Sequence, residues 1–245
     1  MEPVKAPAPL VIISSSPYIH CGSTISAAMR DVLLSLLPAL AAAVYFFGWP
    51  ALSVILTCCL SAVICEALCQ KLMQRPITVG DGSALLTGLL LAFCLPPELS
   101  LGLAAFGSFC AVGIGKQVFG GLGSNIFNPA HLGRAILLAS FPAQMTTWPV
   151  VDALNVFPMT YTDAQTGATV LSLMNEGVTE LPSYGNMLVG AMGGSLGEVS
   201  AVALILGLLF MLWKKIITWQ IPVSILATVF VFTGIMHLVN PVQYA

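Results

Sequence analysis

Charged residues are scarce in this chain of 245 residues. Only 7% of them are Asp, Glu, Lys or Arg, and the mean hydropathy is +0.95, whereas soluble domains carry roughly 25% charged residues. This composition excludes an ordinary water-soluble domain and indicates an integral membrane protein. Because the formal net charge is −2, the chain also lacks the basic surface that binds phosphate backbones, and we expect no nucleic-acid partner.

Closely spaced cysteine motifs are lacking as well. None of the seven cysteines belongs to a Cys-x-x-Cys motif, which argues against an iron–sulfur cluster held by this chain alone. Cys65 and Cys69 are one helical turn apart, with Cys58 and Cys59 two turns earlier. Cysteine in an apolar helix usually behaves as a small hydrophobe, so we expect no metal site.

What the sequence does contain is a series of long apolar blocks. Most are near the roughly 20 residues that a bilayer-spanning helix needs, so the sequence predicts an all-α polytopic membrane protein of about seven transmembrane segments. The block at 82–95 is short and that at 186–213 is broken by Gly193-Gly194, so either is expected to be a half-helix or re-entrant element. The blocks lie at 32–49, 51–69, 82–95, 99–115, 130–148, 186–213 and 217–238.

The basic residues predict the orientation, because Lys and Arg concentrate in cytoplasmic loops. With the N terminus in the cytoplasm, all eight fall on the inner side, Lys116 and Arg134 by extending their long side chains to the interface. The predicted organisation is an N-terminal cytoplasmic segment, helices one to five, an external loop, helices six and seven, and a short external tail. The respective bounds are 1–31, 32–141, 142–185, 186–238 and 239–245.

The external loop contains the heptapeptide Asp163-Ala164-Gln165-Thr166-Gly167-Ala168-Thr169. It resembles the Thr-Gly-Ala-Thr acceptor on which a flavin transferase esterifies FMN, through its phosphate, to the last threonine. The small Gly167 and Ala168 would let a modifying enzyme close around the Thr169 hydroxyl. The alternative is a surface turn, since Thr, Gly and Asp are ordinary turn residues. The resulting site prediction is Thr169 as the attachment point, with Asp163, Thr166, Gly167, Ala168 and Ser172 as the surrounding acceptor motif.

Ionisable residues inside membrane segments are functional candidates by default. Glu66, Lys116 and Glu198 are the candidates for ion coupling. Glu198 has a second interpretation, because Ser195-Leu196-Gly197-Glu198 has the form of a capping box that begins a helix. The two roles can coexist, since a glycine-rich helix N terminus also suits an anion.

The segment Gly120–Ala130 is not generic membrane helix. Its three glycines permit positive φ or close backbone approach, and Asn128-Pro129-Ala130 suits a helix start with Asn as cap and Pro at the first position. Asn-Pro-Ala is also found in aquaporins, and Asn240-Pro241-Val242 resembles a second copy. The expected arginine after that copy is missing, however, and an aquaporin has no use for a long acidic outer loop. A channel or urea-transporter-like protein without redox role is therefore kept as the alternative function.

Several motifs together, in this order, resemble RnfD, a membrane component of the Rnf complex, which is an ion-translocating ferredoxin:NAD⁺ oxidoreductase. RnfD is similar to the B-type component of the Na⁺-pumping NADH:quinone reductase. The motifs cover essentially the whole chain. They are Ser15-Ser16-Pro17-Tyr18-Ile19-His20, the stretches from Asp81 to Leu90 and from Lys116 to Gly123, Phe127-Asn128-Pro129-Ala130, the stretch from Phe141 to Thr146, and the Thr-Gly-Ala-Thr loop.

The resemblance implies a flavoprotein subunit that relays electrons within a larger translocase of the bacterial inner membrane and is not active alone. It implies covalent FMN on Thr169, attached by an external FMN transferase, and a non-covalent riboflavin. The candidate residues for that second flavin are Gly120, Gly121, Gly123, Asn125 and Asn128. The implied partners are the other Rnf components, including an FMN-bearing one on the outer face, and membrane lipid.

The resemblance also implies a urea-transporter-like architecture with an inverted repeat. Members of the family continue past the equivalent of Ala245 into further helices with a Thr-Asp-Pro-Val-Thr type motif, which this sequence does not contain. The expected fold is therefore this architecture without those last helices.

Overall fold

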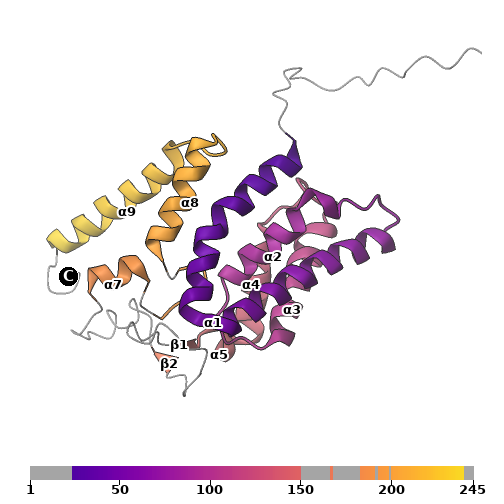
Figure 1. Cartoon of the computed structure of the whole chain (residues 1–245), viewed down its shortest axis with the longest axis horizontal. Coiled ribbons are helices and arrows are strands. Elements are labelled where there is room, and N and C mark those ends of the chain that lie inside the picture. Colours follow the sequence, from indigo (N-terminus) through magenta and orange to yellow (C-terminus); the bar gives the residue numbers. More distant parts are fainter. Residues whose placement is uncertain (1–23, 150–165, 168–182, 191–192, 199, 240–245) are drawn as a thin grey trace, which may run out of the picture.

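The fold was obtained as a computed structural model that describes residues 24–149, 166–167, 183–190, 193–198 and 200–239. It is mostly helical, as the sequence predicts, with one small sheet of two two-residue strands. Figure 1 shows the arrangement of the elements. The helices and strands are α1 (Ile25–Leu72), η1 (Val79–Asp81), α2 (Ser83–Phe93), α3 (Leu101–Phe109), η2 (Cys110–Gln117), α4 (Pro129–Ser140), α5 (Pro142–Met145), β1 (Trp148–Pro149), β2 (Thr166–Gly167), α7 (Tyr184–Val189), α8 (Ala201–Trp213) and α9 (Gln220–Val239).

Helix α1 contains both of the first two apolar blocks. Its 48 residues would measure about 72 Å if straight, more than twice the roughly 30 Å of a bilayer core. The helix is bent at Gly48, whose φ of 63° and ψ of −141° are not helical. Glycine adopts this positive φ without a Cβ clash, and Pro50 lacks the N–H that a continuing helix needs there. The boundary between the predicted blocks 32–49 and 51–69 is thus a kink, and Figure 1 shows two arms that meet at it.

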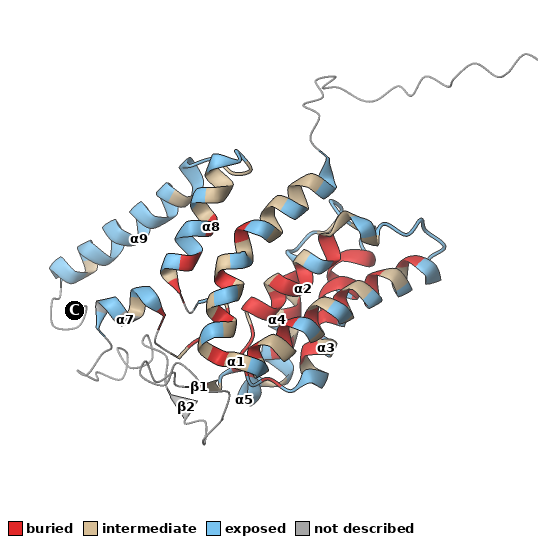
Figure 2. Cartoon of the chain, viewed as in Figure 1, coloured by how far each residue is buried: buried red, intermediate tan, exposed pale blue. Residues whose placement is uncertain are grey.

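The core lies where α1 packs against α2, α3 and η2, and where α4 packs against the same three elements. Figure 2 shows most of the buried surface on these elements. The helices approach closely: a Cβ added at Gly133 of α4 would lie 2.8 Å from the Gly107 carbonyl oxygen of α3. Small residues at helix contacts are typical of membrane helix bundles. Helix α2 is only 11 residues long, as expected for a half-helix.

The expected span at 130–148 is shorter than predicted. Helix α4 ends at Ser140, α5 follows as a single turn, and β1 pairs antiparallel with β2. Pro142 begins α5, which fits this break, because proline cannot continue the hydrogen-bonding of the preceding helix. In Figure 1, α5, β1 and β2 lie at the end of the molecule where α1 bends.

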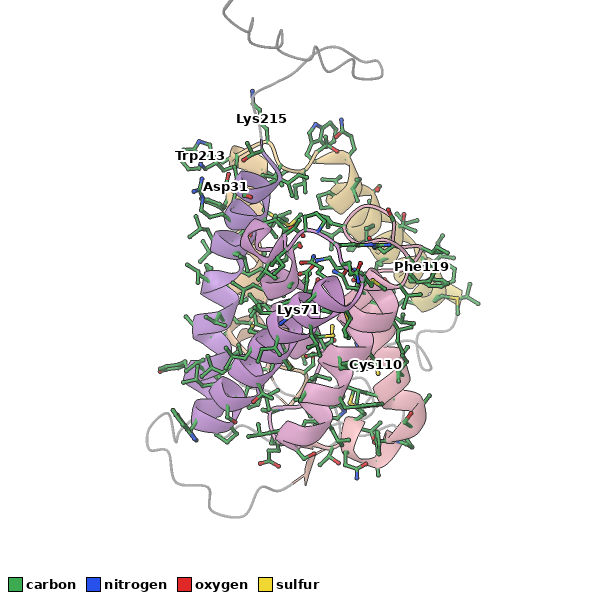
Figure 3. All side chains as sticks on the ribbon, turned by 90° about the vertical axis from the view of Figure 1, so that its right-hand side faces the viewer. Asp31, Lys71, Cys110, Phe119, Trp213 and Lys215 are labelled. Atoms are coloured by element: carbon green, nitrogen blue, oxygen red, sulfur yellow. The ribbon has the colours of Figure 1, made fainter. Side chains whose placement is uncertain are left out.

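The block at 186–213 is broken, as predicted. Residues 193–198 are not helical, and they are held to the end of α2 by two backbone hydrogen bonds, from Leu196 N to Leu95 O (3.1 Å) and from Gly197 N to Phe93 O (2.8 Å). Helix α8 then packs on α1. At its far end the Lys214 ammonium lies 3.9 Å from the Asp31 carboxylate, and Figure 3 shows Asp31, Trp213 and Lys215 together at this end.

By length and composition, α1 and α9 are long and apolar enough to cross a bilayer, while α2 and α8 are shorter apolar helices. Helix α9 has no buried residue within the described chain, and Figure 2 shows it exposed along its length. These findings are consistent with a membrane protein. The count of seven segments stays a prediction.

Candidate functional site

A buried ion pair joins η2 to α1 near the start of α2. The Lys116 ammonium of η2 is 2.7 Å from Oε1 of Glu66 on the second arm of α1, and both side chains are 1% exposed. The structure thus brings together two of the three residues predicted for ion coupling. Desolvating two charges is costly unless hydrogen bonds satisfy them, so the neighbours of the pair matter.

Three polar side chains surround the pair. Gln117 Nε2 donates to Glu66 Oε1 at 2.7 Å, Gln70 Nε2 donates to the same oxygen at 3.3 Å, and Lys116 Nζ donates to Ser83 Oγ at 2.6 Å. The other carboxylate oxygen, Glu66 Oε2, is buried and has no hydrogen-bond partner among the residues that the structure describes. A buried acceptor without a partner is unusual and marks this as a site with unused binding capacity.

The local backbone explains how Lys116 points inward. Helix α3 continues into η2 as a π-helix, a wider form that is frequent at functional sites. Two successive polar residues, Lys116 and Gln117, both contact Glu66 there. The prediction that Lys116 extends to the inner interface was therefore wrong: an acidic partner inside the bundle holds it.

Arg134 lies away from the ion pair, since the neighbouring Gly133 packs near Leu91 of α2. It acts electrostatically on Cys94, as does Glu198, and Cys94 follows the last residue of α2. Ser83 and the ion pair lie at the opposite end of that helix. The placement of Arg134 at the inner interface stays a prediction.

A cavity of about 410 Å³ lies beside the ion pair. This volume is in the range of small-molecule sites, which are mostly apolar with a few polar groups. The polar lining consists of Ser83, Thr87, Lys116, Asn125 and Asn128. The apolar lining consists of Met29, Leu86, Leu90, Leu122, Ile126, Phe127 and Pro129.

Two of the residues predicted for a second flavin, Asn125 and Asn128, therefore line one cavity with Lys116. Asn128 also caps α4 as predicted, its Oδ1 accepting from Ala130 N at 3.1 Å, with Pro129 at the first helical position. Gly120, Gly121 and Gly123 are not part of the lining. Their φ values of 120°, 102° and 88° form the turn that carries Asn125 back over the cavity, as positive φ at glycine allows.

The flavin-acceptor motif is described only at Thr166 and Gly167. Gly167 pairs with Trp148 and Thr166 with Pro149 in the small sheet. Pro149 in turn lies against the α7–α8 connection, since a Cβ added at Gly193 would be 3.1 Å from the Pro149 carbonyl oxygen. The other members, Asp163, Ala168, Thr169 and Ser172, lie outside the described residues.

Glu198 lies apart from Glu66 and Lys116. It is exposed, and its N–H donates to the Ser195 carbonyl in a turn (3.1 Å). The predicted capping box was wrong, because α8 begins only at Ala201, with Ser200 as its cap. The Ser200 hydroxyl accepts from Ala203 N at 3.3 Å, so the predicted cap at Ser195 was five residues too early.

This correction can be tested by stability. Ser200→Ala should lower the free energy of unfolding by about 1 kcal/mol, the usual value of a helix cap, whereas Glu198→Ala, which removes the acceptor that a capping box needs, should change it by less than about 0.5 kcal/mol, as for most surface substitutions. The measurement is the thermal unfolding midpoint of the detergent-purified complex. An equal loss for both variants would restore the capping box.

Sequence reasoning missed Ser83, Gln70 and Gln117 as parts of the site. Each is a buried polar residue within or beside an apolar block, which is the signal that would have identified it. What the sequence could not supply was their distance in space, because Gln117 and its partner Glu66 are 51 residues apart.

Comparison with known proteins connects this arrangement to a family. The model of the NQR2, RnfD, RnfE family matches residues 12–245 of the chain. The chain belongs to this family. The resemblance to RnfD inferred from the sequence motifs is thereby confirmed.

Individual relatives agree. The chain is 45% identical over 230 residues to the D component of the proton-translocating ferredoxin:NAD(+) oxidoreductase complex of Clostridium ljungdahlii, covering 90% of this chain and 68% of that protein. It is 43% identical to the Na(+)-translocating counterpart of Acetobacterium woodii, covering 93% and 72%. It is 40% identical to the D component of the ion-translocating oxidoreductase complex of Stutzerimonas stutzeri, covering 89% and 69%.

Proposed function

We propose that this chain is the RnfD membrane flavoprotein of an ion-translocating ferredoxin:NAD⁺ oxidoreductase complex. In this proposal it carries FMN as a phosphoester on Thr169 and relays electrons, coupled to transport of Na⁺ or H⁺. Family membership and the names of the relatives support the complex. They favour this function over the channel or urea-transporter alternative.

The observation that carries the flavin proposal is the heptapeptide ending at Thr169 in a chain of this family. The pairing of Thr166-Gly167 with Trp148-Pro149 supports it, because it fixes the motif at the end where α1 bends (Figure 1). A tethered flavin there would remain within reach of partner carriers instead of dissociating. Asp163, Gly167 and Ala168 would form the surface that the FMN transferase reads, while Thr166 and Ser172 flank Thr169 as the alternative attachment hydroxyls.

The proposed topology has seven membrane segments in a urea-transporter-like arrangement, the N terminus in the cytoplasm of a bacterium, and the Thr169 loop outside. The two arms of α1 support two of the segments. The ion pair between Lys214 and Asp31 supports the inner side, since it joins the basic end of α8 to the start of α1, away from the bend (Figures 1 and 3). Lipid and the other components, including a second FMN-bearing one, would contact the exposed apolar helices.

We place the second, non-covalent flavin in the cavity beside Lys116. The residues fit such a group: apolar walls suit a planar ring, and the amides of Asn125 and Asn128 with the Ser83 hydroxyl offer donors and acceptors for its polar edge. A bound flavin supplies electron uptake and release, while the protein supplies position and electrostatics. Lys116 would present its ammonium to that edge.

Glu66 and Lys116 are the proposed ion-coupling residues, with Glu198 at the far end of α2 as a third candidate. Glu66 Oε2, which has no hydrogen-bond partner within the described part of the chain, supports this role, because a buried carboxylate oxygen is a ligand for a hard cation or an acceptor for a proton. The relatives include both a proton-translocating and an Na⁺-translocating complex, so the ion itself is left open.

Flavin fluorescence tests the proposed class of protein. A denaturing gel of the purified complex should show a fluorescent band at this chain, because a phosphoester survives denaturation, and acid extraction should release a non-covalent flavin as well. The gel band of a channel would be dark. A fluorescent band with no extractable flavin would retain the covalent site and remove the second one.

A further inference from the structure

A chain of hydrogen bonds leads from the buried ion pair to the surface. Lys116 Nζ donates to Ser83 Oγ at 2.6 Å, and Ser83 Oγ donates to Asp81 Oδ1 at 2.5 Å. Lys116 and Ser83 are 1% and 3% exposed, whereas Asp81 is half-buried and precedes them in the connection between α1 and α2, next to the exposed Gly80. The three groups thus form a hydrogen-bonded path from the protein surface to the buried ion pair.

This hydrogen-bond path also reaches the cavity, because Ser83 and Lys116 both line it. Thr87, one turn along α2, lines the cavity too, but its hydroxyl donates to the Ser83 carbonyl of its own helix (2.8 Å). It is therefore not a link in the path. A serine hydroxyl both donates and accepts, and rotates freely, which is what a proton relay between an ammonium and a carboxylate requires.

We propose that Asp81, Ser83 and Lys116 conduct protons from the surface to the ligand in this cavity. The inference rests on the proposed second flavin. When that ligand receives an electron from a redox carrier of the complex, an N–H bond of Lys116 breaks and its proton bonds to a basic nitrogen or oxygen of the ligand. Ser83 passes its proton to the Lys116 amine and takes one from Asp81, which takes one from water. The balance is one proton from water for each electron.

The surroundings of Lys116 keep it ready for this transfer. Glu66 faces it from α1, and Cys65, the next titratable group on that helix, is near enough to interact with Glu66. Asp81 acts through Ser83 on the α2 side. Helix α4 also packs on η2, and its titratable or charged residues are Arg134 and the exposed His131. Once the Lys116 amine has lost its proton, the negative charge of Glu66 therefore favours reprotonation of that amine through Ser83.

The test uses the intact purified complex with two relay variants, one rescue variant and one control. Asp81→Asn keeps an acceptor for Ser83 but cannot pass a proton, and Ser83→Ala removes the middle link. Ser83→Thr restores the hydroxyl, and Ser61→Ala, a half-buried hydroxyl in α1 bonded to its own helix, is the matched control. Stopped-flow absorbance gives the rate at which the non-covalent flavin is reduced, and redox titration gives its midpoint potential.

We expect Asp81→Asn and Ser83→Ala to reduce this flavin on the order of 100-fold more slowly, the lower end of the range for positioned acid–base groups. The midpoint potential should stay unchanged, and a small weak acid such as formic acid should restore the rate. Ser83→Thr and Ser61→Ala should react like wild type. A merely structural role would shift the potential and would not respond to formic acid.

The outcomes separate this inference from the one on which it rests. Absence of an acid-extractable flavin from wild type overturns both. A normal flavin content with wild-type rates in Asp81→Asn and Ser83→Ala overturns the relay alone. If Ser83→Ala loses the flavin, the result for Asp81→Asn decides, because Asp81 does not line the cavity.

Discussion

Replacing Lys116 with Met is expected to destabilise the chain by about 3–5 kcal/mol, the usual cost of leaving one partner of a buried ion pair without the other. Glu66 would remain 1% exposed with two amide donors but no opposite charge. For a domain of this size each kcal/mol lowers the unfolding midpoint by roughly 2–4 °C. Thermal unfolding of the detergent-purified complex, followed for this chain by immunoblot of the soluble fraction, measures it.

Two further variants test whether that loss of stability comes from leaving a buried charge unpaired. In the double variant Glu66→Gln with Lys116→Met no charge is buried, and Gln117 can still donate to the amide oxygen at position 66, so most of the stability should return. Lys214→Met removes the other described ion pair, in which Lys214 is 42% exposed, and should cost about 0–1 kcal/mol. Equal losses for Lys116→Met and Lys214→Met would contradict the buried pair.

Most of the helical architecture could be predicted from apolar composition and from the residues that begin or break helices. Apolar blocks predicted the helices, Asn128-Pro129 predicted the start of α4, and the glycines before α8 predicted its break. Boundaries failed where a local signal competed with tertiary contacts. At Ser195 the capping pattern was overridden because Leu196 and Gly197 use their N–H groups to bind the end of α2.

The site was predictable residue by residue but not as an arrangement. Glu66 and Lys116 were identified because charge is rare inside membrane segments, yet each had a plausible separate role. Only the fold shows that they form one ion pair and that Asn125 and Asn128 share a cavity with Lys116. Long-range pairing of this kind depends on helix packing, which a single sequence does not encode locally.

Replacing Thr169 with Ala is expected to abolish covalent FMN completely, because the substitution removes the hydroxyl that is esterified. Membrane insertion and assembly should persist, since the loop lies between apolar blocks and Thr169 contributes to none of them. The complex should keep its non-covalent flavin but lose electron transfer through this chain. Thr166→Ala and Ser172→Ala are the matched controls, each removing a neighbouring hydroxyl of the same motif.

Intact-mass spectrometry of this chain, from complexes carrying wild type, Thr169→Ala, Thr166→Ala and Ser172→Ala, tests the central claim most directly. Wild type and both controls should carry the added mass of one FMN less one water, and Thr169→Ala should have the mass of its unmodified sequence. FMN mass retained on Thr169→Ala, or its absence from wild type, would contradict attachment of the flavin at Thr169.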